Sequence, residues 1–437
     1  MLQLAFLLCL ALAPAYASAA PDVTTVESPD GGAAAETRDA QVEATDKLDG
    51  IPATSTEPLV PAADPAAAVD ATPPPSAIAT TPVLPLAQQA AAVARPAGRH
   101  SYFFHGYDYG SQAIFNPLTN ILNRGFDVLQ IRGGDRNPFE TLHGSDVRNV
   151  LDNLAHAYGR VSDEGRWQFT REELLPLSWT QDTMRWVPNY TLHLIGGGMT
   201  YTALREWYED HAVPWAGLLS AMTVMSSALI NESLENKGVS GRNTDCIADI
   251  YFFDLGGILF FSFAPINRFF SETVVVSDWS MQPGLTWPGT SLNNQGNYFA
   301  LKWSLPFYPA LRLFGYLGLG SLFGLSYRLP SGLSWSLGAG LRSTRLINRS
   351  QVVLDNNVNL AASAGLFVDR NESLLASLVV SNVSDYFISF NLYPNAIVRF
   401  QPGIGLWTAV SKNGHLLVGI SVVRALGLGA GWGTVYH

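Results

Sequence analysis

The strongest constraint on the fold is a two-residue periodicity that begins near Glu272 and runs almost to the end of the chain. In residues 333–342 small or polar side chains alternate with apolar ones, and similar segments recur as far as Val423. A period of two places the two kinds of side chain on opposite faces of a β-strand. Turn sequences rich in Asn, Asp, Gly and Pro separate the segments. This pattern predicts roughly ten consecutive strands in an antiparallel meander.

The composition of the two faces indicates what surrounds this sheet. In many strands the apolar face is large and aromatic, whereas the other face carries Gly, Ala, Ser, Asn or Arg. An outer-membrane β-barrel has this arrangement, because its outer face meets lipid and its inner face meets a lumen or a plug. We therefore predict a mainly β protein, an up-and-down transmembrane β-barrel of about twelve strands; a soluble sandwich is the alternative. The candidates for interfacial aromatic girdles are Trp279, Trp287, Trp303, Trp335, Trp407 and Trp432.

The first nineteen residues have the features of a secretory signal peptide. An apolar run from Leu2 to Ala15 ends in small residues, and Ala17-Ser18-Ala19 offers a cleavage signal. The run is shorter than the ~20 apolar residues that a spanning helix needs. We expect residues 1–19 to be removed on export, so that Cys246 is the one remaining cysteine and no internal disulfide can form.

Residues 20–97 are predicted to be a disordered acidic linker. The segment is rich in Ala, Pro and Thr, and no Phe, Tyr or Trp occurs from Pro21 to Ala97. Without such side chains it cannot bury enough apolar surface to offset the entropy of ordering. Eleven acidic and three basic residues give it −8 of the chain's net charge of −10. We expect it to lie in the periplasm, with a span of roughly 50 Å as a flexible coil, and residues 98–437 to form the barrel domain.

The acidic balance and the two cysteines exclude several classes of function. Contacts with phosphates need clusters of Lys and Arg, and the chain has no such cluster, so nucleic acid is not an expected partner. Two cysteines cannot form a disulfide framework or a cysteine-rich zinc site. No phosphate-binding loop, His-Glu-x-x-His or Gly-x-Ser-x-Gly motif is present. We expect no cofactor, and the sequence leaves a metal ion undecided.

Between about Pro188 and Pro265 the periodicity changes to that of helices. Asn189, His193, Gly197 and Tyr201 recur every four residues and therefore share one helical face. A second helix is predicted over Trp215–Asn236 and a third from Asp245 to about Phe263. These segments are interpreted as a helical insertion, residues 188–265, that plugs or caps the lumen. The sequence also predicts a helix over Ser145–Tyr158 and a strand over Gly125–Ile131.

The insertion carries the ionisable residues that are most relevant to function. Charges in apolar surroundings are costly unless they are paired or hydrated, so each one is a candidate. A His with several carboxylates can bind a metal ion or perform acid–base chemistry. The alternative is that these residues cap helices and pair with Arg205, Lys237 and Arg242. The candidate catalytic residues are His193, Glu232, Asp245 and Asp249, with Glu206, Glu235 and Asp254 as further ionisable residues of the insertion.

Spaced single residues in this part of the chain carry a resemblance to a known family. The series is Asn189, His193, Gly197, Tyr201, Arg205, Ser226, Glu232, Asp245, Asp249 and Gly256, with Asn123-Arg124-Gly125-Phe126-Asp127 before it. It resembles an uncharacterised family of Gram-negative outer-membrane β-barrel proteins with a domain of unknown function, over about residues 110–265. The resemblance implies a location and an architecture, and no established activity. The ending Gly431–His437 likewise resembles the aromatic-rich final strand that the barrel-assembly machinery recognises, although it ends on His.

Three functional hypotheses follow from the sequence. The leading one is a non-enzymatic outer-membrane protein, either a channel or a structural component, with outer-membrane lipid and lipopolysaccharide as its surroundings and the barrel-assembly machinery as a partner during insertion. The second is a membrane-embedded enzyme that acts on lipid or lipopolysaccharide through His193 and the acidic candidates. The third is a helical inner-membrane protein with spans over Trp215–Ile230 and Ile247–Pro265. The oligomeric state is left open.

Overall fold

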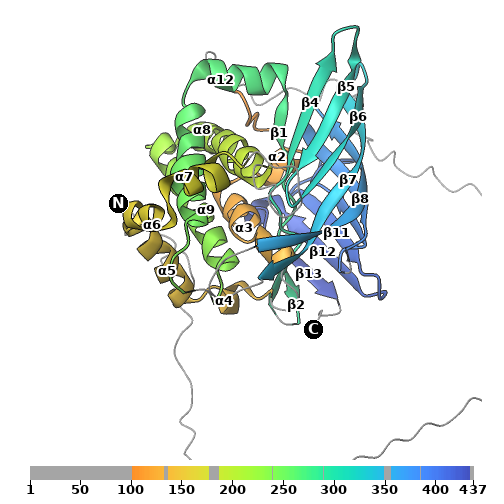
Figure 1. The fold of residues 1–437 in the computed structure, drawn as a ribbon. Coiled ribbons are helices and arrows are strands. Elements are labelled where there is room, and N and C mark those ends of the chain that lie inside the picture. Colours follow the sequence, from red (N-terminus) through yellow and green to blue (C-terminus); the bar gives the residue numbers. More distant parts are fainter. Residues whose placement is uncertain are drawn as a thin grey trace, which may run out of the picture. The chain divides into compact units, whose positions relative to one another are not determined.

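A computed structural model describes residues 101–131, 136–176, 187–238, 240–288, 290–348, 356–383 and 385–433. The predicted signal peptide, residues 1–19, and the predicted linker, residues 20–97, lie outside the described residues, as does the end of the predicted final strand beyond residue 433. All described residues belong to one structural unit, in which a set of helices precedes a large sheet. Figure 1 shows the helices gathered on one side of the sheet.

The sheet has thirteen strands and follows the predicted meander over most of its width. Its order is β1-β4-β5-β6-β7-β8-β9-β10-β11-β12-β13-β2-β3. Every pair is antiparallel except β13 with β2, which are parallel. The strands are β1 (Val276–Asp278), β2 (Gly284–Trp287), β3 (Ser291–Asn293), β4 (Phe299–Leu305), β5 (Tyr308–Leu317), β6 (Gly320–Arg328), β7 (Leu333–Asn348), β8 (Asn356–Arg370), β9 (Ser373–Ser381), β10 (Ile388–Leu392), β11 (Ile404–Val410), β12 (Leu416–Val422) and β13 (Gly429–Gly433).

The hydrogen-bonded ladder is open, and this departs from the predicted closed barrel of about twelve strands. β1 and β3 are its two ends, and they do not pair with each other in the described sheet. The short strands β1 and β2 follow each other in the chain, yet they pair with opposite ends of the meander, β4 and β13. Strands of three or four residues show too little alternation to be counted or paired from sequence, so the prediction missed this connection.

The outer face of the sheet is apolar and exposed, as the alternation predicts. One continuous row in register crosses eleven strands, and all its side chains are exposed except Thr408, which is half-buried. Of the six tryptophans expected in girdles, Trp279 and Trp407 are instead buried inside. The row consists of Trp303, Leu313, Leu325, Leu337, Leu366, Leu378, Phe390, Thr408, Val418, Trp432 and Trp287.

The inner face is buried and largely polar or small. A row one residue away from the outer one consists of Ser326, Ser336, Phe367, Ser377, Asn391, Trp407, Gly419 and Gly431. The sheet curls until distant strands meet across this face. Lys302 on β4 forms an ion pair with Asp369 on β8, four strands away in the order. The rings of Phe314 on β5 and Phe367 on β8 are 5.4 Å apart. Side chains thus cross and occupy the interior.

Helices fill the described chain from Ser111 to Thr273, a longer stretch than the predicted insertion 188–265. They are α2 (Ser111–Ile114), α3 (Pro117–Gly125), η1 (Asp127–Gln130), α4 (Pro138–Thr141), α5 (Gly144–Ala155), α6 (Ala157–Glu164), α7 (Arg166–Phe169), η2 (Thr170–Leu174), η3 (Val187–Gly197), α8 (Gly198–Asp210), α9 (Ala216–Glu235), α10 (Asp245–Ile247), η4 (Ala248–Asp254), α11 (Leu255–Phe260), α12 (Ala264–Arg268) and η5 (Phe269–Thr273). A short helix η6 (Val423–Ala425) follows β12.

The predicted strand over Gly125–Ile131 is wrong, and with it the idea of an insertion between strands. Residues Asp127–Gln130 form a 3₁₀-helix, and no strand precedes Val276 in the part of the chain that the structure describes. Val128, Leu129 and Ile131 favour strands intrinsically, but here they pack against Leu234 of α9 in a buried cluster. Packing against α9 therefore overrides the local preference. The predicted helices over Ser145–Tyr158 and Trp215–Asn236 are confirmed by α5 with the start of α6, and by α9.

The segment before α5 reaches the inner face of the sheet. Ser111 of α2 donates a hydrogen bond to the Asp278 carbonyl, and Gln130 of η1 accepts one of 2.7 Å from Arg342 on β7. Arg136 pairs with Asp385 and bonds Tyr386. These contacts place part of the helical region against the interior. The residues that carry these contacts lie N-terminal to residues 188–265, the segment that was expected to plug or cap a lumen.

The length and composition of the described helices were compared with those of membrane spans. Among the described residues, no single helix is long and apolar enough to cross a membrane. Asp245–Phe260 and Ala264–Thr273 meet the criteria only as a pair, and the two segments are bent by 86° relative to each other.

Candidate functional site

Three of the four candidate catalytic residues meet in one place. Ligand atoms of His193, Glu232 and Asp249 all lie within 4.8 Å of one another. Each comes from a different helical element, η3, α9 and η4 respectively. The fourth candidate, Asp245 in α10, lies outside this group of ligand atoms, one helical turn before Asp249. We refer to His193, Glu232 and Asp249 as the carboxylate–histidine cluster.

The carboxylates of the cluster are buried without hydrogen-bond donors. Glu232 is 1% exposed, and neither of its side-chain oxygens receives a hydrogen bond from an N–H or hydroxyl group of the protein. Asp249 is 5% exposed, and its Oδ1 likewise receives none. Burial, together with the charges of neighbouring carboxylates, raises the pKa of both groups well above the usual range. The two carboxyl groups lie close enough to share a proton. Buried carboxylates in this state must be neutralised, by protons or by a cation.

A second layer holds His193 in place. Nδ1 of His193 lies 3.2 Å from Oδ2 of Asp254, and Arg124 pairs with the other oxygen of the same carboxylate. Burial raises the pKa of Asp254, but the charges of Arg124 and His193 outweigh it and leave this pKa below its usual value. Asp254 therefore carries its charge, and its hydrogen bond with Nδ1 leaves Nε2 of His193 as the nitrogen available to the cluster.

Arg124 is the residue of this site that the sequence candidates did not include. It lies in the last turn of α3, outside the insertion, and also donates to the Leu192 carbonyl of η3. The sequence feature that could have identified Arg124 is the segment Asn123–Asp127, which is part of the family resemblance. Asn123 bonds the Met281 carbonyl near the sheet and Asp127 bonds Asn231 of α9. This short segment thus connects the sheet, α9 and the buried ion pair.

The helices that carry the cluster include two π-helical segments. His193 lies in η3, and Asp249 and Asp254 lie in η4, and both elements are π-helices. The periodicity of four predicted helices here, and helices are what the structure shows; it did not specify their type. π-helical segments are rare in proteins, and those that occur are often at functional sites.

Glycines let these segments cross closely. A Cβ on Gly257 of α11 would lie 2.5 Å from the Leu194 carbonyl of η3, and one on Gly198 would lie 2.6 Å from the Gly257 carbonyl. A Cβ on Gly197 would lie 2.9 Å from Asp254 Oδ1. Gly197 and Gly198 are therefore points of close contact between helical segments.

Other sequence candidates have structural roles elsewhere. Glu206 of α8 accepts hydrogen bonds from the backbone N–H groups of Tyr102, Phe103 and Phe104, at 2.6, 3.0 and 2.8 Å. It fixes the start of the described chain to the helices. Cys246 is fully buried in an apolar cluster, where burial raises the pKa of its thiol.

Asp127, beside the site, gives a prediction about pH. Burial raises its pKa to about 7, against a value near 3.9 in an unfolded chain. Between these values the folded protein holds a proton that the unfolded chain has lost, so the free energy of unfolding falls as pH rises from about 4 to about 7. Asp127→Asn should remove this dependence. The stability difference between variant and wild type, from urea unfolding, should change by on the order of 1 kcal/mol per pH unit.

Asp152 supplies the control for this experiment. Its hydrogen bond from Arg160 lowers the pKa of Asp152, so this exposed group titrates below the window. Asp152→Asn and wild type should therefore keep a constant stability difference from pH 5 to 7. A constant difference for Asp127→Asn as well would contradict the prediction.

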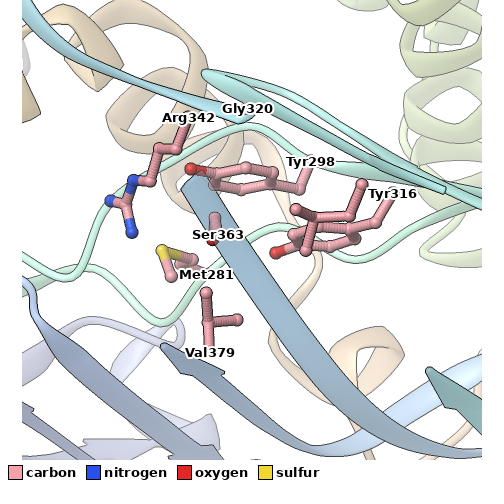
Figure 2. A pocket seen from close by; sticks show the side chains of 8 residues that line it. Met281, Tyr298, Tyr316, Gly320, Arg342, Ser363 and Val379 are labelled. Atoms are coloured by element: carbon pink, nitrogen blue, oxygen red, sulfur yellow. The ribbon is translucent and has the colours of Figure 1, made fainter. Parts of the chain in front are cut away.

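The cavity in Figure 2 lies away from the carboxylate–histidine cluster and shares no residue with it. It is enclosed by the curl of the sheet, and Arg342, Tyr298 and Tyr316 are among the side chains around it. Its volume of ≈ 10 Å³ has room for about one water molecule. The cavity is thus too small for a substrate.

Comparisons with protein-family models, with curated proteins and with solved structures found no match for this chain. The resemblance to the outer-membrane family therefore stays a prediction, and the geometry of the site carries the functional argument.

Proposed function

We propose that this protein is a membrane-embedded enzyme of the bacterial outer membrane, which hydrolyses an ester bond of lipid or lipopolysaccharide at the carboxylate–histidine cluster. The observation that carries the proposal is the convergence of His193, Glu232 and Asp249 within 4.8 Å in a buried site. Segments far apart in the chain bring these groups together, and buried carboxylates without donors are costly to stability. Groups kept at such a cost, with strongly shifted pKa values, are typical of catalytic sites.

The outer face of the sheet supports the membrane location. Its row is exposed and apolar over β4 to β13 except at the half-buried Thr408, while the residues that alternate with it are buried and mostly polar or small. A protein in water seldom exposes so wide an apolar surface, whereas strands that face lipid require it.

A single charge on this face tests the location. Leu337 on β7 is 63% exposed and pairs with Leu325 and Leu366 of the apolar row. Leu337→Arg should lower the free energy of unfolding by about 2–4 kcal/mol in a bilayer. In water the same change on an exposed position would stay within about 0.5 kcal/mol. Urea unfolding in lipid vesicles measures it.

Trp167→Arg is the matched control, because Trp167 on α7 is also exposed and apolar but lies outside the sheet. It should change stability little. Equal effects of the two variants would count against strands that face lipid. So would recovery of the protein with the inner membrane and identical mobility of boiled and unboiled samples in a gel.

Glu232 is the acid–base residue of the proposed reaction. One of its carboxylate oxygens accepts a proton from a water molecule as the water oxygen attacks the ester, and the same proton then passes to the leaving alcohol, which gives an acid and an alcohol as products. Asp254 fixes the ring of His193 beside Glu232 through Nδ1. Arg124 keeps Asp254 charged throughout.

The helical run that carries two buried carboxylates of the site also exposes apolar side chains. The helical run of η4 and α11 buries Asp249 and Asp254 on one side and exposes Phe252, Leu255 and Leu259 on the other. Acyl chains can therefore contact the same run that carries the carboxylates. An open channel has less support, because side chains such as Lys302 and Phe367 occupy the interior of the sheet.

The function is tested by lipid analysis of cells that overproduce the protein. The wild type should increase the products of lipid or lipopolysaccharide hydrolysis, and mass spectrometry of extracted lipids and of lipopolysaccharide separates the two sources. His193→Gln should reduce this change by at least about 100-fold. His211→Gln is the control, because His211 stacks on Trp207 outside the cluster. The proposal would lose its support if overproduction of the wild type left the lipid profile unchanged. It would also lose its support if His193→Gln changed the profile as much as the wild type does.

A further inference from the structure

We infer that the carboxylate–histidine cluster binds one divalent transition-metal ion, with Zn²⁺ as the first ion to test. The inference rests on the same site as the proposed function and deepens it by naming the ion. The ligands are Nε2 of His193 and one carboxylate oxygen each from Glu232 and Asp249. Three protein ligands with a fourth position open for water are typical of catalytic zinc sites.

The geometry and the unpaired oxygens point to an ion. The three ligand atoms lie within 4.8 Å of one another, a separation that a single ion can bridge. Both oxygens of Glu232 and one of Asp249 are buried and receive no hydrogen bond from an N–H or hydroxyl group of the protein. A structural role would leave these oxygens paired with N–H groups, as those of Glu206 are. Here the oxygens of Glu232 and Asp249 face each other and His193. A bound cation would satisfy all three side chains.

The surroundings of His193 match those of a metal ligand. A histidine that binds a metal usually donates its other ring N–H to a carboxylate, which fixes the ring and its tautomer. Asp254 provides this carboxylate at 3.2 Å from Nδ1, and Arg124 balances its charge. With that pair neutral, the two carboxylates of the cluster match the charge of one divalent cation. The imidazole nitrogen favours a transition metal over Ca²⁺ or Mg²⁺, which prefer oxygen ligands.

The first measurement is stoichiometry on the full-length protein, refolded in detergent, stripped with a chelator and dialysed against Zn²⁺ or Co²⁺. We expect one ion per chain by elemental analysis and a visible Co²⁺ absorption band. Asp249→Asn and Glu232→Gln should each weaken binding by more than the ~10–100-fold that loss of a supporting residue such as Asp254 costs. Asp245→Asn is the control, because Asp245 is a nearby acid outside the cluster. It should keep wild-type stoichiometry.

Stability measurements separate a metal site from a pair of carboxyls that share a proton. Without metal, Glu232→Gln removes one of two adjacent buried carboxyls that fold only by taking up a proton, so near neutral pH the variant should unfold at a higher temperature than the wild type. With Zn²⁺ the wild type should unfold at the higher temperature, because it gains more binding energy on folding than Glu232→Gln does. An unchanged order in both conditions, or wild-type protein that binds no Zn²⁺, would overturn the inference.

The failure of this inference and that of the proposed function are distinguishable. Hydrolysis that depends on His193 but persists in stripped protein without Zn²⁺ would reject the metal and keep the enzyme. One bound ion that is lost in Asp249→Asn, together with unchanged lipid profiles, would keep the metal and reject lipid hydrolysis.

Discussion

Replacement of Lys302 by Met should destabilise the sheet more than any change on its outer face. Lys302 on β4 is fully buried and pairs with Asp369 on β8 and with Glu372, the latter at 2.6 Å. Its loss leaves the Asp369 charge buried without its partner, which costs about 3–5 kcal/mol. We expect a matching fall in the free energy of unfolding, measured in detergent by urea unfolding and by the temperature at which the folded gel band disappears.

A double variant and a neighbouring residue make this prediction specific. Lys302→Met with Asp369→Leu should recover most of the lost stability, because replacement of both partners by apolar groups of similar size is close to neutral. Trp303→Leu, one residue along β4 and exposed on the outer face, should have a small effect. A double variant as unstable as the single one would show that the cost comes from packing alone. The predicted role of the ion pair would then be wrong.

Arg124→Leu should have the second large effect, and it acts on the candidate site. The change leaves Asp254, which is fully buried, with His193 as its one remaining charged neighbour in the described ion pairs. Breaking one side of a buried pair lowers the free energy of unfolding by about 3–5 kcal/mol. Loss of the Arg124 charge should raise the pKa of Asp254 and weaken its hydrogen bond with Nδ1 of His193, so hydrolysis should fall with it. Urea unfolding and lipid analysis measure the two effects.

Two further variants separate charge from packing at Arg124. Arg124→Leu combined with Asp254→Asn should restore stability but not hydrolysis, because the neutral amide does not fix the ring of His193 as the carboxylate does. Arg160→Ala breaks an exposed pair with Asp152 and should change stability little. Full activity in Arg124→Leu would mean that the buried pair does not support the reaction.

The sequence predicted the strands better than the connections between them. The alternation in β6 to β12 places every other side chain outward, and the exposed row through Leu325, Leu337 and Leu366 confirms that assignment. It did not predict the parallel pairing of β2 with β13, because a strand of four residues has no usable period. It also did not predict that Trp279 and Trp407 face the interior, since an indole suits either face.

The sequence predicted which ionisable residues could form the candidate site, but not which of them meet. His193, Glu232 and Asp249 stood out because charges in apolar helical segments are costly. Nothing in the spacing could show that Asp249 and not Asp245 completes the cluster, or that Arg124, more than a hundred residues before Asp254, is its partner. Such choices depend on how η3, α9 and η4 cross, and close contacts at Gly197, Gly198 and Gly257 set that crossing.

The sequence alone thus determined the two-faced strands, the main helices and the set of ionisable residues from which a site can be built. These features are local, because a period of two or of about four residues acts through neighbours in the chain. Only the tertiary structure decided which of those residues meet, how the helical segments contact the inner face and why the interior is occupied. Each of these depends on side chains far apart in the chain, such as Lys302 with Asp369. Buried charged groups are stable only when they are paired, and the order of residues in the sequence does not show which groups pair.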